Sequence, residues 1–421
     1  MYQAPRGTTD ILPGEQVYWN YLRRKAEKIC QVFAYQRIDT PAFEDARLFQ
    51  RSIGEGTDIV EKEMYTFKDR SGTELTLRPE GTASICRAYI QNGMHNLPQP
   101  VRLYYFADIF RYERPQSGRY RQHHQFGIEA IGEQDAALDA EIINIAWKLY
   151  ADIGLHNLSL YLNSIGCTTC RPAYLQVLRN YYAQYNESLC PDCKRRMQKN
   201  TLRLLDCKNP NCVPLTEQAP KSVDYLCSPC LDHFKKLTAY LIALGIPFIL
   251  NHRLVRGLDY YNRTVFEVAP EGEIASQATL GGGGRYDNLI EDLGGKPTPA
   301  VGFATGIERL VLNLKKQNVN VPDDIPANST FLAYLGKEAK AVALKLSGDL
   351  RIEGVPITLS IGDRSLKAQL RQASSLGVRY TLIIGDDEIK SGSVIVRDMV
   401  KGEQQTVPQD TIVTKLSKAP Q

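Results

Sequence analysis

One short stretch of the sequence, FRYERPQSGRYRQHHQFGIEA (Phe110 to Ala130), combines fixed cations with carboxylates and keeps apolar residues at both ends. Its four arginines are Arg111, Arg114, Arg119 and Arg121. Each carries a planar guanidinium that can hold a phosphate through two parallel hydrogen bonds. Such a density of cations fits either a solvated surface hairpin or a site for a polyanionic ligand, and the stretch alone does not decide between them.

The end of this stretch alternates in polarity, as a strand with one core face does. Gln125, Gly127 and Glu129 share one face of such a strand, because side chains two residues apart point the same way. The residues between them and after them are apolar: Phe126, Ile128 and Ala130. The pattern predicts a sheet face that suits a polar ligand with both cationic and anionic parts.

A second segment, LTLRPEGTASICRA (Leu75–Ala88), joins a strand to a helix. Pro79 breaks the strand, and Glu80 and Thr82 open the helix that follows. A carboxylate and a hydroxyl at this place can bind a ligand ammonium, but they can also only cap the helix. The segment alone favours capping.

A third segment, LVRGLDYYNRTVFEV (Leu254–Val268), places a cation beside a glycine. Arg256 precedes Gly257, where backbone can approach a ligand closely. Tyr260 and Tyr261 follow at the edge of a strand, and buried tyrosines are usually core residues with a satisfied hydroxyl.

Two glycine-rich segments come later in the chain. TLGGGGRYDNL (279–289) contains neither GxGxxG nor GxxxxGK[ST], so its glycines predict a turn and close backbone approach to a small ligand rather than a phosphate loop. AVGFATGIERLVLNL (300–314) predicts a strand that leads into an amphipathic helix. Glu308 and Arg309 lie on the first turn of that helix, where an arginine can face the same pocket.

Eight of the ten cysteines form four close pairs. The pairs are Cys167 with Cys170, Cys190 with Cys193, Cys207 with Cys212, and Cys227 with Cys230. This spacing is typical of zinc ligands, and two tetrahedral Cys₄ sites would use all eight residues. Three ways of combining the pairs remain open. Reduced buried thiols and disulfides are the competing readings, and a reducing compartment argues against disulfides.

These segments must be positioned by more than one domain, since 421 residues exceed the usual length of one. Helical patterns over 15–34 and 139–153, with strands at 102–112 and 125–131, predict an α+β core on an antiparallel sheet. Strand–helix alternation after residue 330 predicts a small α/β domain with a largely parallel sheet. The expected divisions are 1–165 and 236–318 for the two parts of the core, 166–235 for a Cys-rich insertion, 319–329 for a linker, and 330–421 for the C-terminal domain.

Composition narrows the class of protein further. Hydrophobic content of 43% and charged content of 23% are ordinary for a soluble globular chain. The net charge of +4 is too small to indicate a nucleic-acid partner without local clustering. No apolar run is long enough for a bilayer, and the start, MYQAPRGTTDILPGE, lacks a secretory signal pattern. We therefore expect a cytoplasmic protein without a membrane partner.

Five segments, in chain order, resemble the signature motifs of class II aminoacyl-tRNA synthetases, and specifically of the histidyl-tRNA synthetase family. Thr40-Pro41 after a long helix resembles motif 1, the dimer-forming element. Residues 110–129 resemble motif 2, and residues 302–310 resemble motif 3. LVRGLDYY and GGGGRYD resemble the two histidine-specific segments. The likeness covers nearly the whole chain, including the C-terminal domain, which resembles the anticodon-binding domain of subclass IIa.

The resemblance implies roles for the cations. Arg111 would be catalytic by holding the α-phosphate of ATP, and Arg309 would contact the other phosphates and flank the adenine. Arg256 would stabilise the α-phosphate and the histidine carboxylate, partly replacing a metal ion that relatives use. His123 stands where an aromatic residue such as Phe is expected beneath the adenine, and it keeps a flat ring.

The resemblance also implies which residues bind histidine and tRNA. Glu80, Thr82 and Gln125 would take the α-ammonium of histidine. Glu129 and Tyr261 would hydrogen-bond the two imidazole nitrogens, and Tyr260 would belong to the same pocket. The loop residues near the tRNA acceptor end would be Arg114, Gln116 and Arg119.

The implied function is that of a histidine–tRNA ligase, with histidine, ATP with Mg²⁺, and tRNA(His) as substrates and with a homodimer as the assembly. Structural zinc rests on the cysteine spacing instead, because most members of the family lack these cysteines. One alternative is the regulatory paralogue of ATP phosphoribosyltransferase, which lacks the anticodon-binding domain and typically loses the key arginine. A third reading is a zinc-dependent RNA-binding protein without ligase activity.

Overall fold

The computed structural model describes residues 2–54, 57, 59–113, 118–273, 278–322 and 330–417. The chain divides into two compact units, Met1–Val321 and Pro322–Gln421. Each unit has its own sheet and its own hydrophobic core.

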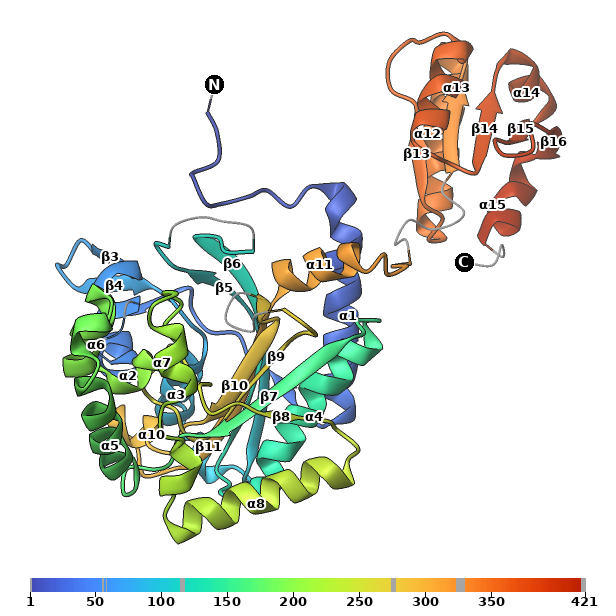
Figure 1. The fold of residues 1–421 in the computed structure, drawn as a ribbon. Coiled ribbons are helices and arrows are strands. Elements are labelled where there is room, and N and C mark those ends of the chain that lie inside the picture. The colour runs from blue at the N-terminus through green and yellow to red at the C-terminus, as the bar shows by residue number, and fades with distance from the viewer. Residues whose placement is uncertain are drawn as a thin grey trace. The chain divides into compact units, whose positions relative to one another are not determined.

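An eight-stranded sheet forms the centre of the first unit (Figure 1). Its strands, in spatial order, are β1 (Gln36–Arg37), β5 (Val101–Phe110), β6 (Gln122–Ile131), β11 (Ala300–Gly306), β10 (Gly281–Arg285), β9 (Asn262–Pro270), β7 (Leu158–Ser164) and β8 (Ile249–Leu250). The six central strands pair antiparallel, and only the short edge strands β1 and β8 pair parallel with their neighbours. The predicted α+β class with an antiparallel sheet is confirmed.

Helices cover one face of this sheet and the Cys-rich region packs toward the other (Figure 1). The helices that share a core with the first face are α1 (Gln16–Val32), α4 (Ala136–Asp152), α8 (Ser228–Ala243) and α11 (Ile307–Lys316). The second face packs against α3 (Thr82–Gln91), α10 (Leu289–Asp292), α5 (Arg171–Ala183), α6 (Pro191–Lys199) and α7 (Val213–Glu217). A small sheet of β2 (Phe43–Asp45), β4 (Glu74–Leu77) and β3 (Tyr65–Lys68), with α2 (Ala46–Ile53), completes the unit.

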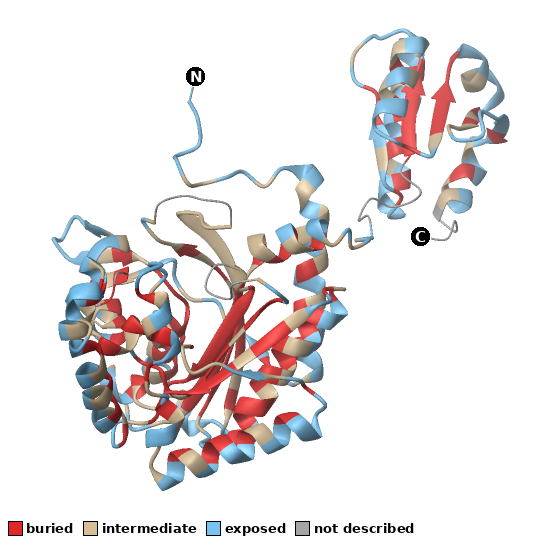
Figure 2. Ribbon diagram, in the orientation of Figure 1, coloured by how far each residue is buried: buried red, intermediate tan, exposed pale blue. Residues whose placement is uncertain are grey.

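The alternation in β6 is observed, but both of its faces are buried along the second half of the strand (Figure 2). Phe126 and Ile128 enter the core beneath α4, as their apolar side chains require. Glu129, on the opposite face, is only 1% exposed. The polar face is therefore enclosed by protein, which excludes the reading of a solvated hairpin for this part of the stretch.

The glycines of GGGGRYD form strand β10, so the predicted turn is wrong. Gly281 to Gly284 pair with β9 on one side and β11 on the other. Glycine is typical of turns because it has no side chain. In β10 the missing side chains instead let neighbouring groups approach the sheet closely. A Cβ on Gly282 would come within 2.8 Å of the Arg256 guanidinium.

Arg285, which follows these glycines, points to the helical side of the sheet. Its fully buried guanidinium pairs with Asp139 of α4 and also with Asp287 at 3.0 Å. Burial alone would raise the pKa of Asp139, but the Arg285 charge holds it well below its usual range. This ion pair attaches β10 to the helix layer.

The second unit is a five-stranded sheet in the order β13 (Ile357–Leu359), β12 (Thr330–Tyr334), β14 (Tyr380–Ile384), β15 (Ser393–Asp398) and β16 (Gln404–Pro408). Its helices are α12 (Lys337–Ile352), α13 (Leu366–Ser375), α14 (Asp386–Ser391) and α15 (Gln409–Ser417). The first three strands pair parallel, whereas β15 and β16 add antiparallel. Among the described residues of the whole chain, no helix has the length and apolarity to cross a membrane.

Gly302→Ala tests how tightly the polar face is packed. A Cβ at this position of β11 would overlap the Glu129 carboxylate and lie 2.9 Å from the Ile128 carbonyl oxygen. We expect the free energy of unfolding of the first unit to fall by about 1–3 kcal/mol. Urea unfolding followed by tryptophan fluorescence measures this, because both tryptophans, Trp19 and Trp147, lie in that unit.

Gly14→Ala is the matched control, since a Cβ there meets nothing within 4 Å. If both substitutions lower the free energy of unfolding by the same small amount, the polar face is not tightly packed at Gly302.

Candidate active site

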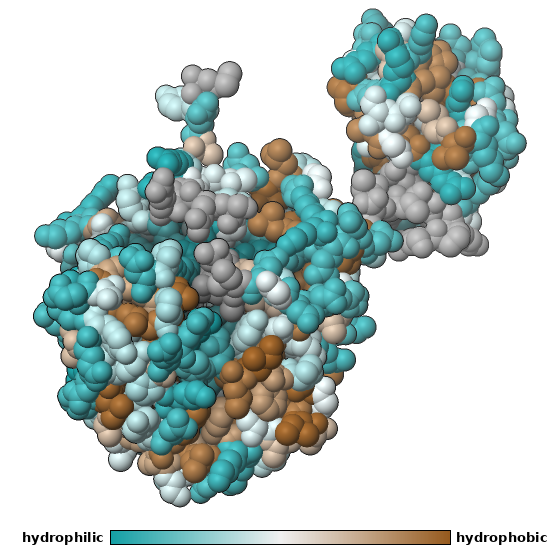
Figure 3. Space-filling model, in the orientation of Figure 1, coloured by the Kyte–Doolittle hydropathy of each residue, from teal (hydrophilic) through white to brown (hydrophobic). Residues whose placement is uncertain are grey.

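A cavity of about 1200 Å³ opens above the polar face of the sheet. Six of the residues predicted to bind ATP, histidine or tRNA line it: Arg111, Arg119, His123, Gln125, Arg256 and Arg309. Its floor includes Gly281, Gly282 and Ala304. The opposite wall is formed by the Cys-rich region, including Cys190 and Cys207. Figure 3 shows mainly hydrophilic side chains over the outer face of that region, which is the left side of the first unit in Figure 1.

A cross-strand row of small residues crosses the polar face of the sheet. Gly127, Ala304 and Gly282 lie opposite one another on β6, β11 and β10. The row is continued by Tyr105 on β5 and by Glu267 on β9. The glycines make room for neighbouring side chains: a Cβ on Gly127 would overlap the Tyr105 ring, and one on Gly282 would lie 2.8 Å from the Arg256 guanidinium.

The next row of the same face centres on Glu129, which lies opposite Gly302. Its carboxylate accepts hydrogen bonds from the hydroxyls of Thr82 at 2.7 Å, Tyr105 at 3.4 Å and Tyr286. Burial raises the pKa of Glu129 to about 8, although these hydrogen bonds oppose the shift. The group is a buried carboxyl surrounded by hydroxyl donors, which suits the recognition of a polar ring.

Glu80 and the two tyrosines lie beside this cluster. The Glu80 carboxylate accepts from the backbone N–H groups of Thr82 at 2.7 Å and of Ala83 at 2.8 Å, so the capping geometry is present. Tyr260 donates its hydroxyl to Glu80 at 3.4 Å, and the ring centroids of Tyr260 and Tyr261 are 4.7 Å apart. Burial raises the pKa of Glu80 above its usual value. The Glu80 carboxylate therefore caps α3 and also lies beside the tyrosines of the predicted histidine pocket.

The predicted phosphate-binding arginines converge on the cavity from three elements. Arg111 follows β5 and donates from Nε to the Pro79 carbonyl at 2.8 Å. Arg309, on the first turn of α11, donates from Nε to the Gly118 carbonyl at 3.2 Å. Arg256 lies in the loop before β9 and pairs with Glu267, which also accepts a hydrogen bond from Thr279 at 2.9 Å.

The loop residues predicted to meet tRNA are only partly described. Arg114 and Gln116 lie outside the described residues. Arg119 lines the cavity and contacts Glu113 at 3.4 Å.

His123 lines the cavity as an uncharged ring. Burial, aided by the charge of Arg111, lowers its pKa to about 3. A neutral flat ring at this place is compatible with stacking on a base.

Several residues of the site were missed from the sequence. Tyr105 and Tyr286 donate to Glu129, and Glu267 holds Arg256. Tyr286 belongs to the GGGGRYD segment, so the sequence could have pointed to it. The role of Tyr105 follows only from its pairing opposite Gly127, which the sequence does not give. His124 was also missed: its ring lies between Glu308 at 2.8 Å and Asp108 at 3.1 Å. These carboxylates outweigh burial and raise the pKa of His124.

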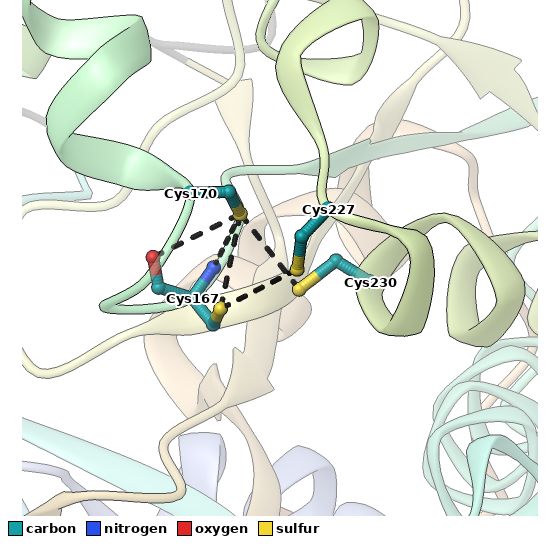
Figure 4. A group of neighbouring side chains, drawn as sticks. All are labelled: Cys167, Cys170, Cys227 and Cys230. Atoms are coloured by element: carbon teal, nitrogen blue, oxygen red, sulfur yellow. Dashed lines mark hydrogen bonds between the residues drawn. The ribbon is translucent and has the colours of Figure 1, made fainter.

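The eight paired cysteines meet in two tetrads, which resolves the choice that the sequence left open. The first tetrad is Cys167, Cys170, Cys227 and Cys230 (Figure 4), and the second is Cys190, Cys193, Cys207 and Cys212. Within each tetrad all sulfurs lie within 4.8 Å of one another. All ten cysteines are free thiols, so the disulfide reading is not observed. Either tetrad could hold a metal ion.

The antiparallel sheet, its arginine-lined cavity and the separate α/β unit define a class II aminoacyl-tRNA synthetase. A family model described as "Histidyl-tRNA synthetase" matches residues 7–170 and 183–310, and one described as "Anticodon binding domain" matches 325–419. The chain belongs to the histidyl-tRNA synthetase family. The family predicted from the five motifs is confirmed.

Individual relatives agree with this family. A histidine–tRNA ligase of Dehalococcoides mccartyi is 57% identical over 418 residues, which cover 99% of this chain and 100% of the relative. One of Desulforamulus reducens is 48% identical over 403 residues, which cover 96% of each chain. The crystal structure of apo S. aureus histidyl-tRNA synthetase matches with a TM-score of 0.83 and 36% identity, covering 99% of this chain and 100% of that one. These relatives confirm the prediction of a ligase and do not favour the regulatory paralogue.

Glu129→Gln tests the buried carboxyl through the pH dependence of stability. Glu129 keeps its proton up to pH about 8 in the folded chain but loses it near 4.5 when unfolded. The unfolded chain then binds fewer protons between these values, so stability falls with rising pH, by at most roughly 1.4 kcal/mol per unit. We expect the variant to show a flatter fall between pH 5.5 and 8 in urea unfolding.

The control is Glu187→Gln, an exposed position. If the free energy of unfolding falls with pH as steeply in both variants as in the wild-type protein, Glu129 is ionised throughout this range.

Proposed function

We propose that this chain activates histidine with ATP to form histidyl-adenylate and pyrophosphate, and then transfers the histidyl group to tRNA(His). One observation carries the proposal: a single cavity is bordered by Arg111, Arg256 and Arg309, and the Glu129 cluster lies in the next row of the same sheet face. The arginines suit a triphosphate, and the buried cluster suits a small polar side chain.

In the first step, a histidine carboxylate oxygen attacks the α-phosphorus of ATP, which enters as its Mg²⁺ complex. The bond to the β-phosphate oxygen breaks, and pyrophosphate leaves with the electron pair. Arg111 and Arg256 stabilise the charge that develops on the α-phosphate, and Arg309 holds the departing phosphates. His123 supports the adenine. The enzyme supplies no covalent nucleophile, because positioning and charge placement suffice.

The amino acid is recognised by the groups around Glu129. Glu80, Thr82 and Gln125 take its α-ammonium. Glu129 and Tyr261 take the two imidazole nitrogens, with Tyr260 packed beside them. An amino acid without these nitrogens leaves buried polar groups unpaired, which such sites discriminate against strongly.

In the second step, the 3′-terminal hydroxyl of tRNA(His) attacks the carbonyl carbon of the adenylate, and AMP leaves. Arg114, Gln116 and Arg119 approach the acceptor end. The C-terminal unit, which matches an anticodon-binding family model, reads the other end of the tRNA.

We assign the divisions of the chain accordingly. Residues 1–165 and 236–318 form the catalytic core, 166–235 the insertion, 319–329 the linker and 330–421 the anticodon-binding domain. The protein acts as a homodimer through the motif 1 region near Thr40. It works in the cytoplasm, where a reducing environment keeps its ten cysteines from forming disulfides.

Each cysteine tetrad holds one structural Zn²⁺. Tetrahedral zinc with Zn–S bonds of about 2.3 Å requires sulfurs about 3.8 Å apart. The sulfurs of Cys167 and Cys170, Cys167 and Cys227, and Cys190 and Cys207 are each 3.8 Å apart. The donor set therefore fits zinc in both composition and spacing. Zinc bound there would supply cross-links that close the insertion, with no part in the reaction.

Arg256→Ala tests the assignment of the ligase reaction. Removing this guanidinium takes away a charge needed mainly in the transition state, so we expect adenylate formation to slow by about 10²–10³-fold. The dissociation constant for histidine should change by less than about threefold. Single-turnover adenylate formation and calorimetric histidine binding give the two values. Unchanged adenylate formation would refute the assigned role, and wild-type protein that forms no adenylate would refute the function.

Metal analysis tests the zinc sites. We expect two zinc ions per chain of purified protein, one in Cys227→Ser and one in Cys207→Ser, because these cysteines belong to different tetrads. The double variant Cys167→Ser/Cys227→Ser should still retain one ion, since both cysteines belong to the first tetrad. Less than one zinc per wild-type chain, without exposure to chelators, would refute the sites.

A further inference from the structure

The first cysteine tetrad lies where the insertion leaves and rejoins the core. Strand β7 ends at Ser164, and Cys167 follows three residues later. Cys170 immediately precedes α5, and Cys227 immediately precedes α8, which returns the chain to the core beneath the sheet. A metal held by this tetrad would fix the starts of both helices, one on each side of the insertion.

Arg171 connects this tetrad to the proposed histidine pocket. It directly follows Cys170 and is the first residue of α5, and its backbone N–H donates to the Cys167 carbonyl at 2.9 Å. Its guanidinium donates to the carbonyls of Ile165 at 3.2 Å and Gly166 at 3.1 Å. The same guanidinium donates to the carbonyl of Tyr261 at 2.6 Å. One side chain thus joins the tetrad, the end of β7 and the peptide of a pocket tyrosine.

The backbone next to Tyr261 is attached at the same place. Ile165 donates its N–H to the Arg263 carbonyl, and Arg263 donates its N–H to the Gly166 carbonyl, each at 2.8 Å. Arg263 adopts a φ of 47°, which L-residues rarely do and which neighbouring contacts must maintain. The pocket segment around Tyr261 is therefore held from the side of the first tetrad.

The second tetrad region holds the same segment from the cavity side. Asn200, which follows α6, donates from Nδ2 to Asp259 at 2.5 Å. Lys199 contacts Glu61 of the core at 2.7 Å. The contacts of Arg171 and Asn200 thus reach Tyr261 and Asp259, two residues apart in the chain.

We propose that Arg171 is a positioning residue that couples metal binding in the first tetrad to the affinity of the pocket for histidine. The inference rests on the proposed function. When all four cysteines hold the metal, α5 begins directly after Cys170 and the Arg171 guanidinium holds the Tyr261 peptide. When a ligand is lost, the start of α5 and with it the guanidinium shift, and Tyr261 is no longer oriented toward the imidazole. The insertion then regulates the amino-acid site without touching the amino acid.

The test compares Arg171→Gln and Arg171→Lys in the full-length protein. Glutamine cannot hold three carbonyls, so the dissociation constant for histidine should rise by about tenfold or more in calorimetric titration. Lysine keeps a cation that reaches fewer carbonyls, so its effect should be smaller. The KM for ATP in pyrophosphate exchange should stay within about twofold, because the phosphate-binding arginines are untouched, and both zinc ions should remain.

Arg179→Gln is the matched control. Arg179 lies on the same helix but donates to Thr201 within the insertion, at 3.0 Å. We expect wild-type histidine affinity in this variant. Equal losses in Arg171→Gln and Arg179→Gln, an unchanged histidine constant in Arg171→Gln, or loss of zinc from it would each overturn the inference.

A double-mutant cycle separates coupling from independent damage. Cys227→Ser opens the first tetrad and should weaken histidine binding in wild-type protein, but much less in the Arg171→Gln background. Cys207→Ser, in the second tetrad, is the comparison, and its coupling to Arg171→Gln should be smaller than that of Cys227→Ser, because Arg171 does not contact that tetrad. Full additivity with Cys227→Ser would refute the coupling. Wild-type protein that binds no histidine would instead refute the proposed function.

Discussion

The polar face of the central sheet depends on one buried carboxyl group, Glu129, and on the glycine that lies opposite it, Gly302. A carboxyl without water needs hydrogen-bond donors, and hydroxyls of Thr82, Tyr105 and Tyr286 supply them from three different elements. The carboxylate fits only because Gly302 lies opposite it. In the adjacent row, Gly127 makes room for the Tyr105 ring and Gly282 makes room for the Arg256 guanidinium. Gly282 and Ala304 of that row line the cavity.

This constraint also explains the layers around the sheet. The apolar face of β6 packs against α4, and the buried Arg285–Asp139 pair attaches β10 to that helix. The strands that form the floor of the pocket are therefore attached to the helices on the opposite face of the sheet. The Cys-rich insertion forms the opposite wall, and its residues Arg171 and Asn200 donate hydrogen bonds to Tyr261 and Asp259. Zinc bound in the proposed sites would make the insertion rigid, and the insertion would in turn position the segment that carries Asp259 and Tyr261.

Much of the fold and site was predictable because the informative residues carry local patterns. Alternation placed Glu129 on a polar face, and cysteine spacing predicted the tetrads but not their partners, which depend on three-dimensional proximity. The prediction of a turn at GGGG was wrong because glycine is typical of turns in local sequence, whereas these four glycines lie inside the sheet as part of β10. Tyr105 and Glu267 were missed because their roles follow from cross-strand register, which one strand's sequence does not contain.

The central claim is that the hydrogen-bonding groups around Glu129 read both nitrogens of an imidazole. The most direct measurement is ATP–pyrophosphate exchange by the wild-type protein with histidine and with its two ring-N-methylated isomers. Each methyl group removes the hydrogen bond of one ring nitrogen. It also adds volume to a ring that must fit among the side chains around Glu129. The account predicts that histidine supports exchange and that each isomer lowers kcat/KM by about 10²-fold or more. Equal exchange with histidine and with either isomer would contradict it.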